Sequence, residues 1–405
     1  MRILQLAQFL PPIAGGEERH VWNLSRELAA RSHQVTLLGF DTGGQPGEEW
    51  SDGVRVVRVR PSAARLSALY SDTARPHALP LPDPAVRRAI GRELSTARFD
   101  VVHAHNWIVN SALRPASRAG VPVVLTLHDY SHRCATKRLM WHGRTPCPGP
   151  SAARCLPCAT GHYGMLSGPV TAVANAWSAG RRANLLTASV AVSTPVADAA
   201  GDRLGPRVVP NFIPDQLIVA EIVPPEPGAP LVFAGDLNHD KGLPVLLDAY
   251  ARLATAPPLF LAGRQVGTAA SGLPPGVRWA GELAHEQVIA LYRSAVAVVV
   301  PSVWPDPCPT VVLEAMAAGR PVVAAASGGI VELVDDRRTG LLVPPGDPVA
   351  LAEALASLLA DPIAAAALGA AGRDRARRFG AAAVTTRIEE FYADAIARHR
   401  TPDRR

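Results

Sequence analysis

Short apolar runs alternate with helical patterns along most of this chain. Arg2–Leu6 is apolar and suited to a strand, and Glu17–Arg31 then carries apolar residues at helical spacing. Further strand-like runs follow at Gln34–Leu38, Val54–Val59, Val101–His103, Val121–Leu127, Val190–Val192 and Arg207–Val209. Continuous apolar strands separated by helices predict a parallel sheet that is covered on both faces.

A proline-rich stretch separates two halves of this kind. Pro210–Pro230 holds six prolines and little periodicity, so we interpret it as a linker. The alternation resumes at Leu231–Ala234, Leu259–Ala262, Val277–Ala280, Ala295–Val300, Pro321–Ala325 and Gly340–Val343. We therefore predict the α/β class, with two doubly wound Rossmann-like domains facing each other across a cleft. The expected boundaries are a first domain at 1–210, a linker at 211–230, a second domain at 231–382, and a final helix with a basic tail at 383–405.

Length and composition fit this organisation. A chain of 405 residues is too long for one ordinary core, and 48% hydrophobic with 19% charged residues indicates a packed protein. The net charge of +6 suits an anionic ligand such as a nucleoside diphosphate. With only 5% aromatic residues, we expect no nucleic-acid partner. We find no secretory signal pattern or membrane-spanning window, and expect a cytoplasmic protein.

Two basic stretches lie in the last part of the chain, at Arg373–Arg378 and Arg398–Arg405. We interpret them as solvated helix faces and a tail. The alternative is peripheral contact with an anionic membrane surface. Neither interpretation decides the function.

The segment Pro301–Pro345 holds the most specific pattern. The loop Pro307–Pro309 precedes a helix expected to begin near Thr310, and backbone N–H groups at a helix start can bind phosphate. Glu314, one turn into that helix, can accept hydrogen bonds from ribose hydroxyls, and Asp306 can reach the hydroxyls of a sugar. Glu332 follows a glycine-rich turn and is a further candidate for the same site.

This segment resembles the family 4 retaining glycosyltransferases of the GT-B fold. Those sequences place a Glu, seven residues and then Glu-Ala here, followed by Gly-x-Pro-Val-Val and Gly-Gly-x-x-Glu. The resemblance continues in FAGDLNHDKGL, in the N-terminal PPIAGGEERH, and in DVVHAHNW and VLTLHDY. It covers nearly the whole chain and is weaker over residues 40–95 and 130–190.

The resemblance implies a sugar transfer from a nucleotide-diphosphate donor, most simply a UDP-sugar, to a hydroxyl acceptor, with no metal required for catalysis. The first domain would hold the acceptor, through loops in Gly39–Ile90 and Tyr130–Gly168, and the second would hold the donor. The helix Val384–Arg398 would cross back onto the first domain. The implied site residues are His128 and Asp306 at the reacting sugar, and Gly15, Gly16, Lys241, Pro309, Thr310, Val311 and Glu314 at the donor. Arg264, which follows the strand Leu259–Ala262, is a further donor-site candidate that the sequence itself suggests.

Lys241 is the cation best placed to stabilise the departing phosphate, and the Gly15–Gly16 turn lets the backbone approach the phosphates. Two positions depart from the family pattern. Asp306 replaces a glutamate, and Asp236 stands where the family has an arginine. Either Arg264 supplies the missing positive charge, or the chain binds its donor weakly.

The histidines and cysteines leave alternatives open. Within the resemblance His128 positions the donor sugar and acceptor, whereas His103 and His105 rank below it. Cys134, Cys147, Cys155 and Cys158 fall within 25 residues and include one CxxC pair. They form a structural zinc site or a set of free thiols, and catalytic redox use is a third alternative. Cys308 is expected to be a packing residue.

Two other function classes remain at this point. A nucleotide-sugar-binding protein that has lost turnover is one, because Asp236 weakens the expected phosphate site. A nicotinamide oxidoreductase is the other, although the chain lacks G-x-G-x-x-G after its first strand.

Overall fold

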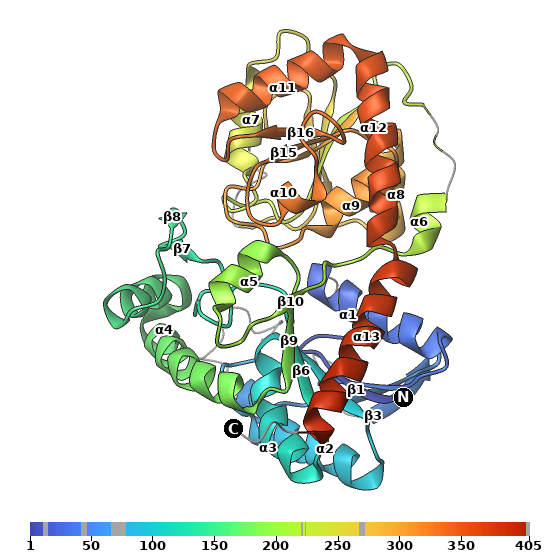
Figure 1. The fold of residues 1–405 in the computed structure, drawn as a ribbon. Helices are drawn as coiled ribbons and strands as arrows, with labels where there is room; N and C mark the ends of the chain where they lie inside the picture. Colours follow the sequence, from blue (N-terminus) through green and yellow to red (C-terminus); the bar gives the residue numbers. More distant parts are fainter. Residues whose placement is uncertain are drawn as a thin grey trace. The chain divides into compact units, whose positions relative to one another are not determined.

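The computed structural model describes residues 1–10, 15–41, 47–65, 78–219, 222, 224–266 and 272–401. Its internal contacts divide the chain into two compact units, shown in Figure 1. Unit 1 comprises Met1–Pro210 and Ala381–Arg405, and unit 2 comprises Asn211–Gly380. Each is an α/β unit built on one largely parallel sheet.

Unit 1 has an eight-stranded sheet in the order β10-β9-β6-β5-β1-β2-β4-β3. Its strands are β1 (Arg2–Leu6), β2 (Gln34–Phe40), β3 (Gly47–Ser51), β4 (Val54–Val59), β5 (Val101–His105), β6 (Val123–Leu127), β9 (Ala188–Ala191) and β10 (Arg207–Val208). All neighbours are parallel except β3 and β4. The predicted strands are apolar because both faces are covered; Ile3, Leu4 and Leu6 of β1, for example, are fully buried.

The edge strand β3 was not predicted, because its sequence GEEWS is polar and largely exposed. It is held to β4 by cross-strand ion pairs, in which Arg55 contacts Glu48 and Arg58 contacts Glu49. Charged side chains at a sheet edge also discourage pairing with other chains.

The helices of unit 1 pack in pairs, α1 with α13 and α2 with α3 (Figure 1). They are α1 (Gly16–Ala30), α2 (Pro84–Thr96), α3 (Val109–Ala119), α4 (Ala152–Leu185), α5 (Thr194–Ala200) and α13 (Ala381–Arg400), with short 3-10 turns η1 (Ser62–Arg65) and η3 (Asn106–Ile108). A small hairpin, β7 (Met140–Trp141) with β8 (Thr145–Pro146), precedes α4. The final helix α13 belongs to unit 1, where the Tyr392 hydroxyl accepts a hydrogen bond from Gln5 Nε2.

Unit 2 has a six-stranded, all-parallel sheet in the order β13-β12-β11-β14-β15-β16. Its strands are β11 (Leu231–Ala234), β12 (Leu259–Ala262), β13 (Val277–Gly281), β14 (Ala297–Val300), β15 (Val322–Ala325) and β16 (Leu341–Val343). Its helices are α6 (Asp215–Val219), α7 (Leu243–Ala251), α8 (His285–Ser294), α9 (Thr310–Ala317), α10 (Ile330–Leu333), α11 (Pro348–Ala360) and α12 (Pro362–Ala376), followed by the turn η4 (Arg377–Phe379). Helix α7 packs with α11, and α9 with α12.

The described part of the expected linker is built into unit 2. Asn211 Nδ2 donates to the backbone oxygen of Cys308 at 3.0 Å, and Ile213 pairs with Gly380 in a parallel bridge. Arg373, which we expected on a solvated helix face, donates to the backbone oxygen of Ile218. This arginine is therefore used inside unit 2 to fasten α6 to α12.

Within the described ranges, no single helix combines the length and apolar character of a membrane span. Helices α11 and α12 meet those criteria only when taken together, across a bend of 105°.

Both sheets have a point at which the strand order reverses. In unit 1 the chain runs outward from β1 to β2 and β4 on one side, and from β5 to β6 and β9 on the other. In unit 2 the same reversal lies between β11 and β14. Ligands of doubly wound sheets bind outside the carboxyl ends of the strands at this switch point, which selects the loops after β1, β5, β11 and β14.

Candidate active site

Lys241 and Asp306 meet at the switch point of unit 2. Lys241 follows β11 and Asp306 follows β14, and Nζ lies 2.6 Å from Oδ2. Ser302 Oγ donates to the same carboxylate oxygen at 3.2 Å. The Asp306 side chain is buried, whereas Lys241 keeps 29% of its surface exposed. A lysine ammonium has three N–H donors, so this ion pair leaves it able to bind an anion at the same time.

The backbone around Lys241 is fixed by a close approach. Gly242, the N-cap of α7, has φ +77°, and a Cβ at this position would overlap the backbone oxygen of Pro301, which directly follows β14. The Lys241 N–H donates to Asn238 Oδ1 at 2.9 Å. These contacts hold the loop after β11 against the loop after β14, which brings the ammonium to Asp306.

The loop that carries Asp306 is held from the next strand. The Gly329 N–H donates to the Asp306 backbone oxygen at 2.7 Å, and Ser327 Oγ donates to the Trp304 backbone oxygen. Gly328 has φ +55°, and a Cβ there would overlap the Asp306 backbone. The glycine-rich turn after β15 therefore shapes the Asp306 loop.

Helix α9 begins at Thr310 as predicted, and Pro309 precedes it without giving a side-chain cap. The first N–H groups of a helix have no intrahelical acceptor. The N–H groups of Thr310 and Val311, four to five residues after Asp306, are therefore at the uncapped start of α9.

Arg264 and Asp236 form a second ion pair at this edge, after β12 and β11. The guanidinium Nη2 lies 2.7 Å from Oδ2 and Nε lies 3.3 Å from Oδ1. A close backbone approach supports the pairing, because a Cβ at Gly263 would overlap the Gly235 backbone oxygen. The carboxylate at 236 is thus neutralised by the arginine that the sequence analysis nominated.

Glu314 is buried in α9, and its Oε1 lies 3.8 Å from His285 Nε2 at the start of α8. The sequence analysis did not select His285.

Glu332 lies in α10 close to Cys308. Burial first, and then the carboxylates of Asp306 and Glu332, raise the pKa of Cys308 to about 12. The Cys308 thiol stays protonated, as befits a packing residue.

In unit 1, four buried histidines gather at the carboxyl ends of β5 and β6. His105 Nδ1 lies 2.8 Å from His128 Nε2, and the two rings stack with centroids 5.1 Å apart. His20 of α1 meets the His128 ring edge-on at 5.1 Å. The network extends to His103, whose Nδ1 lies 2.7 Å from the Tyr392 hydroxyl and whose Nε2 lies 2.7 Å from Thr126 Oγ1. His103 and His105 are therefore structural partners of His128.

Burial lowers the pKa of these rings. It brings the pKa of His20 to about 4, and burial followed by the nearby His20 brings that of His103 to about 3. The pKa of His105 is also lowered well below its ordinary value, by burial and then by its histidine neighbours. These three rings are neutral at pH 7, so the histidine neighbours of His128 are uncharged.

A carboxylate pair lies at the switch point of unit 1. Asn106, with φ +56°, donates from Nδ2 to Glu17 Oε2 at 2.6 Å and to Asp129 Oδ2 at 3.4 Å. Burial first, then the charges of Glu18 and Asp129, raise the pKa of Glu17 well above its ordinary value. The three residues follow β1, β5 and β6 and form a polar centre that can bind hydroxyls.

Gly15 and Gly16 lie at the start of α1, beside Glu17. Gly15 is extended with φ −153°, and a Cβ at Gly16 would meet no heavy atom within 4 Å. Neither glycine is required by backbone strain, and Gly16 leaves open space at the helix start. The preceding Pro11–Ala14 of the family-like motif lie outside the described residues.

The chain has only two lysines, and both lie at these switch points. Lys241 pairs with Asp306. Lys137 follows β6, and its Nζ lies 4.5 Å from the centre of the ring of Trp107, which follows β5. The charge of Lys137 also lowers the pKa of Glu17, opposing the larger effect of burial.

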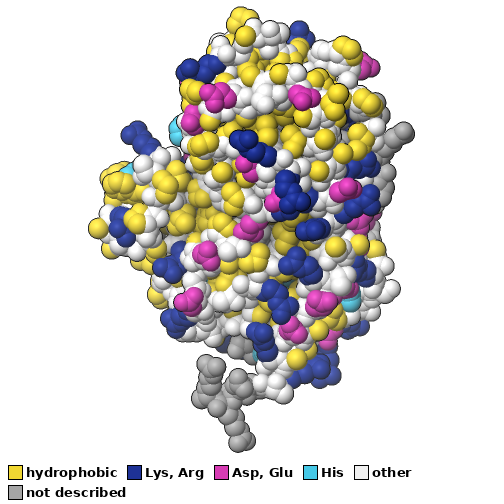
Figure 2. All heavy atoms as spheres, turned by 45° about the horizontal axis from the view of Figure 1, so that its top comes forward, with side chains coloured by type: hydrophobic (Ala, Val, Ile, Leu, Met, Phe, Trp, Pro, Cys, Tyr) yellow, Lys and Arg dark blue, Asp and Glu magenta, His cyan; other side chains and the backbone are white. Residues whose placement is uncertain are grey.

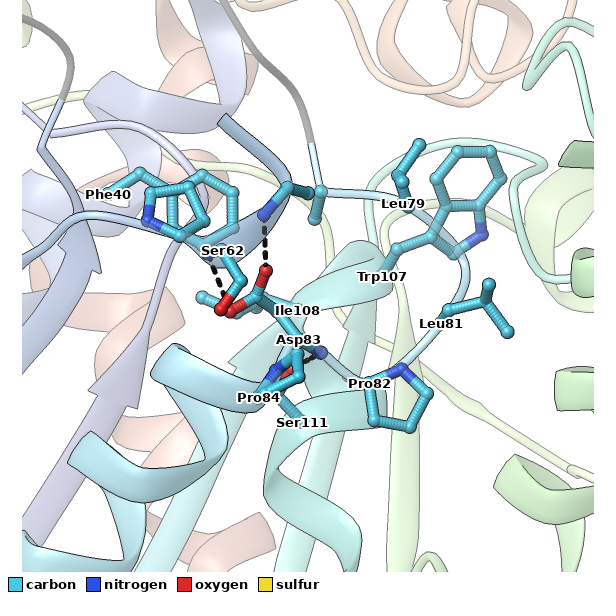
Figure 3. Close-up of a pocket in the computed structure, with 13 residues that line it drawn as sticks. Phe40, Ser62, Leu79, Leu81, Pro82, Asp83, Pro84, Trp107, Ile108 and Ser111 are labelled. Carbon is cyan, nitrogen blue, oxygen red and sulfur yellow. Dashed lines mark hydrogen bonds between the residues drawn. The ribbon is translucent and has the colours of Figure 1, made fainter. Parts of the chain in front are cut away.

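A cavity of about 290 Å3 opens beside Trp107 in unit 1 (Figure 3). It is lined by side chains that follow β2, β4 and β5, among them Phe40, Ser62, Leu79, Leu81, Asp83 and Trp107. The Asp83 carboxylate caps α2 and accepts the N–H groups of Ser62 and Ala63. Asp83 therefore fixes the cavity wall, and the remaining lining is largely apolar.

The four clustered cysteines lie in one part of unit 1. Cys158 Sγ accepts from the His142 N–H, Cys134 Sγ contacts Thr136 Oγ1, and Cys147 Sγ donates to the Gly149 backbone oxygen. Burial, and then the other three thiols, raise the pKa of Cys155. Among the residues described, no three His, Cys, Asp or Glu side chains are grouped as a metal ion requires. The structure gives the zinc site no support, and it stays a prediction that metal analysis can check.

Comparison with known proteins places the chain in a family. A model described as Glycosyltransferase Family 4 matches residues 14–217, and one described as Glycosyl transferases group 1 matches residues 229–361. A glycogen synthase of Mycobacterium tuberculosis is 30% identical over 435 residues, which cover 100% of this chain and 97% of that protein. The chain belongs to the family 4 glycosyltransferases.

Solved structures show that this glycosyltransferase has the GT-B fold. A sucrose-phosphate synthase from Thermosynechococcus elongatus matches with a TM-score of 0.73 at 21% identity, over 98% of this chain and 99% of that one. HepE from Anabaena, in complex with UDP-glucose, matches with a TM-score of 0.68 at 20% identity, over 97% of this chain and 100% of that one. The fold expected from the resemblance is confirmed.

The sequence analysis missed several polar residues of this glycosyltransferase, namely Glu17, His20, Asn106, Asp129 and His285. Two of them had a visible signal. Asn106 and Asp129 each directly follow a strand-end histidine, in HAHN and LHD. Glu17, His20 and His285 lie in helices, and only the sheet order shows which loops they adjoin.

Proposed function

We propose that this glycosyltransferase moves a hexosyl group from a nucleoside diphosphate sugar, with a UDP-sugar as the first candidate, to a hydroxyl of its acceptor. The observation that carries the proposal is the Lys241–Asp306 pair, 2.6 Å apart at the switch point of unit 2 and followed by the uncapped start of α9. HepE, a protein of the same fold, is recorded with UDP-glucose, which supports uracil as the first base to test.

The leaving group is an anionic nucleoside diphosphate, so the site must stabilise negative charge as the glycosidic bond breaks. Lys241 supplies a cation that is already oriented, and the N–H groups of Thr310 and Val311 supply the positive end of α9. Arg264 adds a second guanidinium, held by Asp236. We propose that these groups stabilise the diphosphate without a catalytic metal ion.

Two carboxylates are proposed to hold the donor's hydroxyls. Glu314 is buried in α9, and a carboxylate there accepts hydrogen bonds from the ribose. Asp306 accepts from the transferred sugar while Lys241 and Ser302 fix its orientation. A carboxylate anchored in this way loses little freedom when the sugar binds.

Transfer is proposed to proceed with retention. The bond from the anomeric carbon to the phosphate oxygen breaks, the acceptor oxygen bonds to that carbon from the same face, and the acceptor proton passes to the departing phosphate. In unit 1, His105 holds the ring of His128 in place, and His128 is proposed to position the reacting groups. The acceptor is proposed to bind at Glu17, Asn106 and Asp129 and in the cavity of Figure 3.

A nucleotide panel tests this proposal. Melting curves of the full chain with UDP, GDP, dTDP, ADP or NAD should show stabilisation by one nucleoside diphosphate, since a ligand at about 100 times its Kd adds about 2.7 kcal/mol. Lys241→Met should abolish that shift. The control Arg252→Met removes a cation from an exposed surface pair with Asp248 and should keep it.

The chemical outcome follows from the same preparation. Incubation with the matching nucleotide sugar should release nucleoside diphosphate, and NMR of the product should show the donor's anomeric configuration. Inversion would contradict the retaining mechanism. Tight nucleotide binding without transfer or donor hydrolysis would instead identify a nucleotide-sugar-binding protein, and stabilisation by NAD alone would favour an oxidoreductase.

A further inference from the structure

A long stretch of unit 1 contains no acidic residue. From Tyr130 to Ala197, 68 residues include no Asp or Glu but seven Lys or Arg. All 35 acidic residues of the chain lie in the other 337 positions. The stretch forms the β7–β8 hairpin, α4, β9 and the start of α5, so the surface that these elements contribute carries only apolar, neutral and basic side chains.

Helix α4 is amphipathic, but its polar face is buried and its apolar face is exposed. It bends at Gly164, which has φ +87°. Beyond the bend the face turned into unit 1 is polar: Ser167, Thr171, Asn175, Ser178 and Arg182 are all buried. Arg182 ties this face together, donating to Ser178 Oγ at 2.7 Å and Asn175 Oδ1 at 2.9 Å. Arg182 also donates to the backbone oxygen of His132 at 3.0 Å, which fastens the helix to the rest of unit 1, and a small cluster of Ala135, Ala159 and Ala172 adds apolar contacts.

The opposite face of α4 is apolar and exposed. Leu166, Val170, Val173 and Trp177, spaced four, three and four residues apart, lie on one side of the helix beside Met165. We call these five residues the α4 face. Met165 is 81% exposed, Leu166 73% and Val173 62%. Scattered apolar side chains are ordinary on a surface, but a continuous row indicates an interaction site.

A groove adjoins this face. A cavity of about 380 Å3 is bordered by Val173, Ala176 and Ala179 of α4, by Leu156 and Cys155, and by Arg133. Figure 2 shows apolar side chains on the lobe at the left, with few acidic ones among them. The groove gives the α4 face a hollow in which an extended apolar group can lie.

Basic side chains flank the α4 face. The Arg181 guanidinium lies 4.7 Å from the centre of the Trp177 ring. Trp141 in the hairpin is 44% exposed, and Arg144 next to it is exposed as well. Tryptophan rings and arginines with apolar stems suit the boundary between hydrocarbon and charged headgroups.

We propose that the α4 face docks on the surface of an anionic lipid bilayer. Apolar side chains enter the boundary region, and the basic residues of the acid-free stretch attract the negative headgroups. A second copy of the chain fits the same face poorly. A symmetric contact would oppose two basic, acid-free surfaces with no carboxylate to compensate them. This inference does not rest on the proposed function, because it concerns where the protein lies and not what it transfers.

Vesicle sedimentation of the full chain tests the proposal. We expect it to sediment with phosphatidylcholine vesicles containing about 30% phosphatidylglycerol, and to do so much less with pure phosphatidylcholine or in high salt. The double variant Leu166→Asp/Val173→Asp should lower the partition coefficient about tenfold or more. Both side chains are exposed, so unfolding is not expected, and an unchanged melting temperature verifies it.

The matched control is Ile363→Asp. Ile363 is 85% exposed on α12 of unit 2, and the change adds the same kind of charge outside the α4 face. It should leave vesicle binding unchanged. Arg144→Glu should weaken binding to anionic vesicles only.

Three results would overturn the proposal. The first is no sedimentation of the wild-type chain with anionic vesicles, and the second is equal loss in Ile363→Asp and the double variant. The third is a lipid-free dimer, measured by light scattering, that the double variant converts to monomer; it would make the α4 face an interface between copies of the chain.

Discussion

Arg264 and Asp236, which follow adjacent strands of unit 2, form an ion pair through two hydrogen bonds, 2.7 Å and 3.3 Å long. Each side chain is 38% exposed, and a pair that exposed contributes about 0–1 kcal/mol to stability. The main effect of the pair is on the local charge, because the arginine and the carboxylate neutralise each other. Where the family pattern has one arginine, this chain has an acid and an arginine that balance each other beside the proposed diphosphate site.

This balance predicts opposite effects of the two single substitutions. Arg264→Ala leaves the Asp236 carboxylate uncompensated and should weaken UDP binding about tenfold, the effect of losing a charged hydrogen bond. Asp236→Ala frees the guanidinium for the diphosphate and should strengthen binding. Calorimetric titration of both and of the double variant measures the coupling. Arg252→Ala, which breaks the exposed pair with Asp248, is the control; equal affinities throughout would place the pair outside the donor site.

Glu314 is expected to act in binding or turnover and not in folding. Glu314→Gln keeps the volume of the buried side chain but weakens its acceptance of ribose hydroxyls, so kcat/KM should fall about tenfold or more. The melting temperature should remain near that of the wild type. Glu353→Gln on the exposed side of α11 is the matched control. Unchanged kinetics in Glu314→Gln would remove this residue from the donor site.

The buried histidines predict that unit 1 is sensitive to acid. The pKa values of His20 and His103 are lowered to about 4 and about 3 from an ordinary 6.5. Below pH 6.5 the unfolded chain binds protons that the folded chain excludes, so stability falls as the pH is lowered from 6.5 toward 4. Each group contributes about 1.4 kcal/mol per pH unit in that window.

Urea unfolding at pH 7.5, 6.5 and 5.5 measures this dependence. His20→Asn should flatten the slope by about one proton, whereas His239→Asn, at an exposed position of unit 2, should leave it unchanged. Glu17 acts in the opposite sense, since the pKa of its carboxyl is raised by burial and by Glu18 and Asp129. A stability independent of pH between 7.5 and 5.5 would contradict the neutral histidine network.

Gly328 and Gly346 provide a matched pair of substitutions. Both have positive φ, +55° and +78°, so alanine costs about 1 kcal/mol in backbone strain at each. Only at Gly328 would the new Cβ also overlap the backbone of Asp306. Gly328→Ala should therefore lower the melting temperature further and displace Asp306, weakening donor binding. Equal effects of the two variants on nucleotide affinity would show that the turn does not control the Asp306 loop.

The sequence predicted the strands well because each buried strand of a parallel sheet is a continuous apolar run. It also selected Lys241 and Asp306, although 65 positions separate them, because the segments that carry them resemble the family pattern. The pairing itself depends on β11 lying next to β14. That order is set by packing, and no local pattern records it.

The parts that the sequence did not reveal depend on tertiary contacts. The polar side of α4 is buried because Arg182 finds acceptors on three elements, including His132 and Asn110. Hydrophobic periodicity alone would predict that the apolar face of this helix is buried and its polar face exposed. The histidine network joins Gln5, His103 and Tyr392, and chain separations of this size leave no periodic signal.

The place of Tyr392 bears on how the chain is made. Its hydroxyl, supplied by α13, joins the hydrogen-bonded interior formed by Gln5 and His103. On the ribosome, where domains generally fold as they emerge, residues 1–210 are synthesised long before this helix. Unit 1 lacks α13 until synthesis ends, whereas all of unit 2 has been synthesised before α13. Unit 2 can therefore complete its fold before unit 1 does.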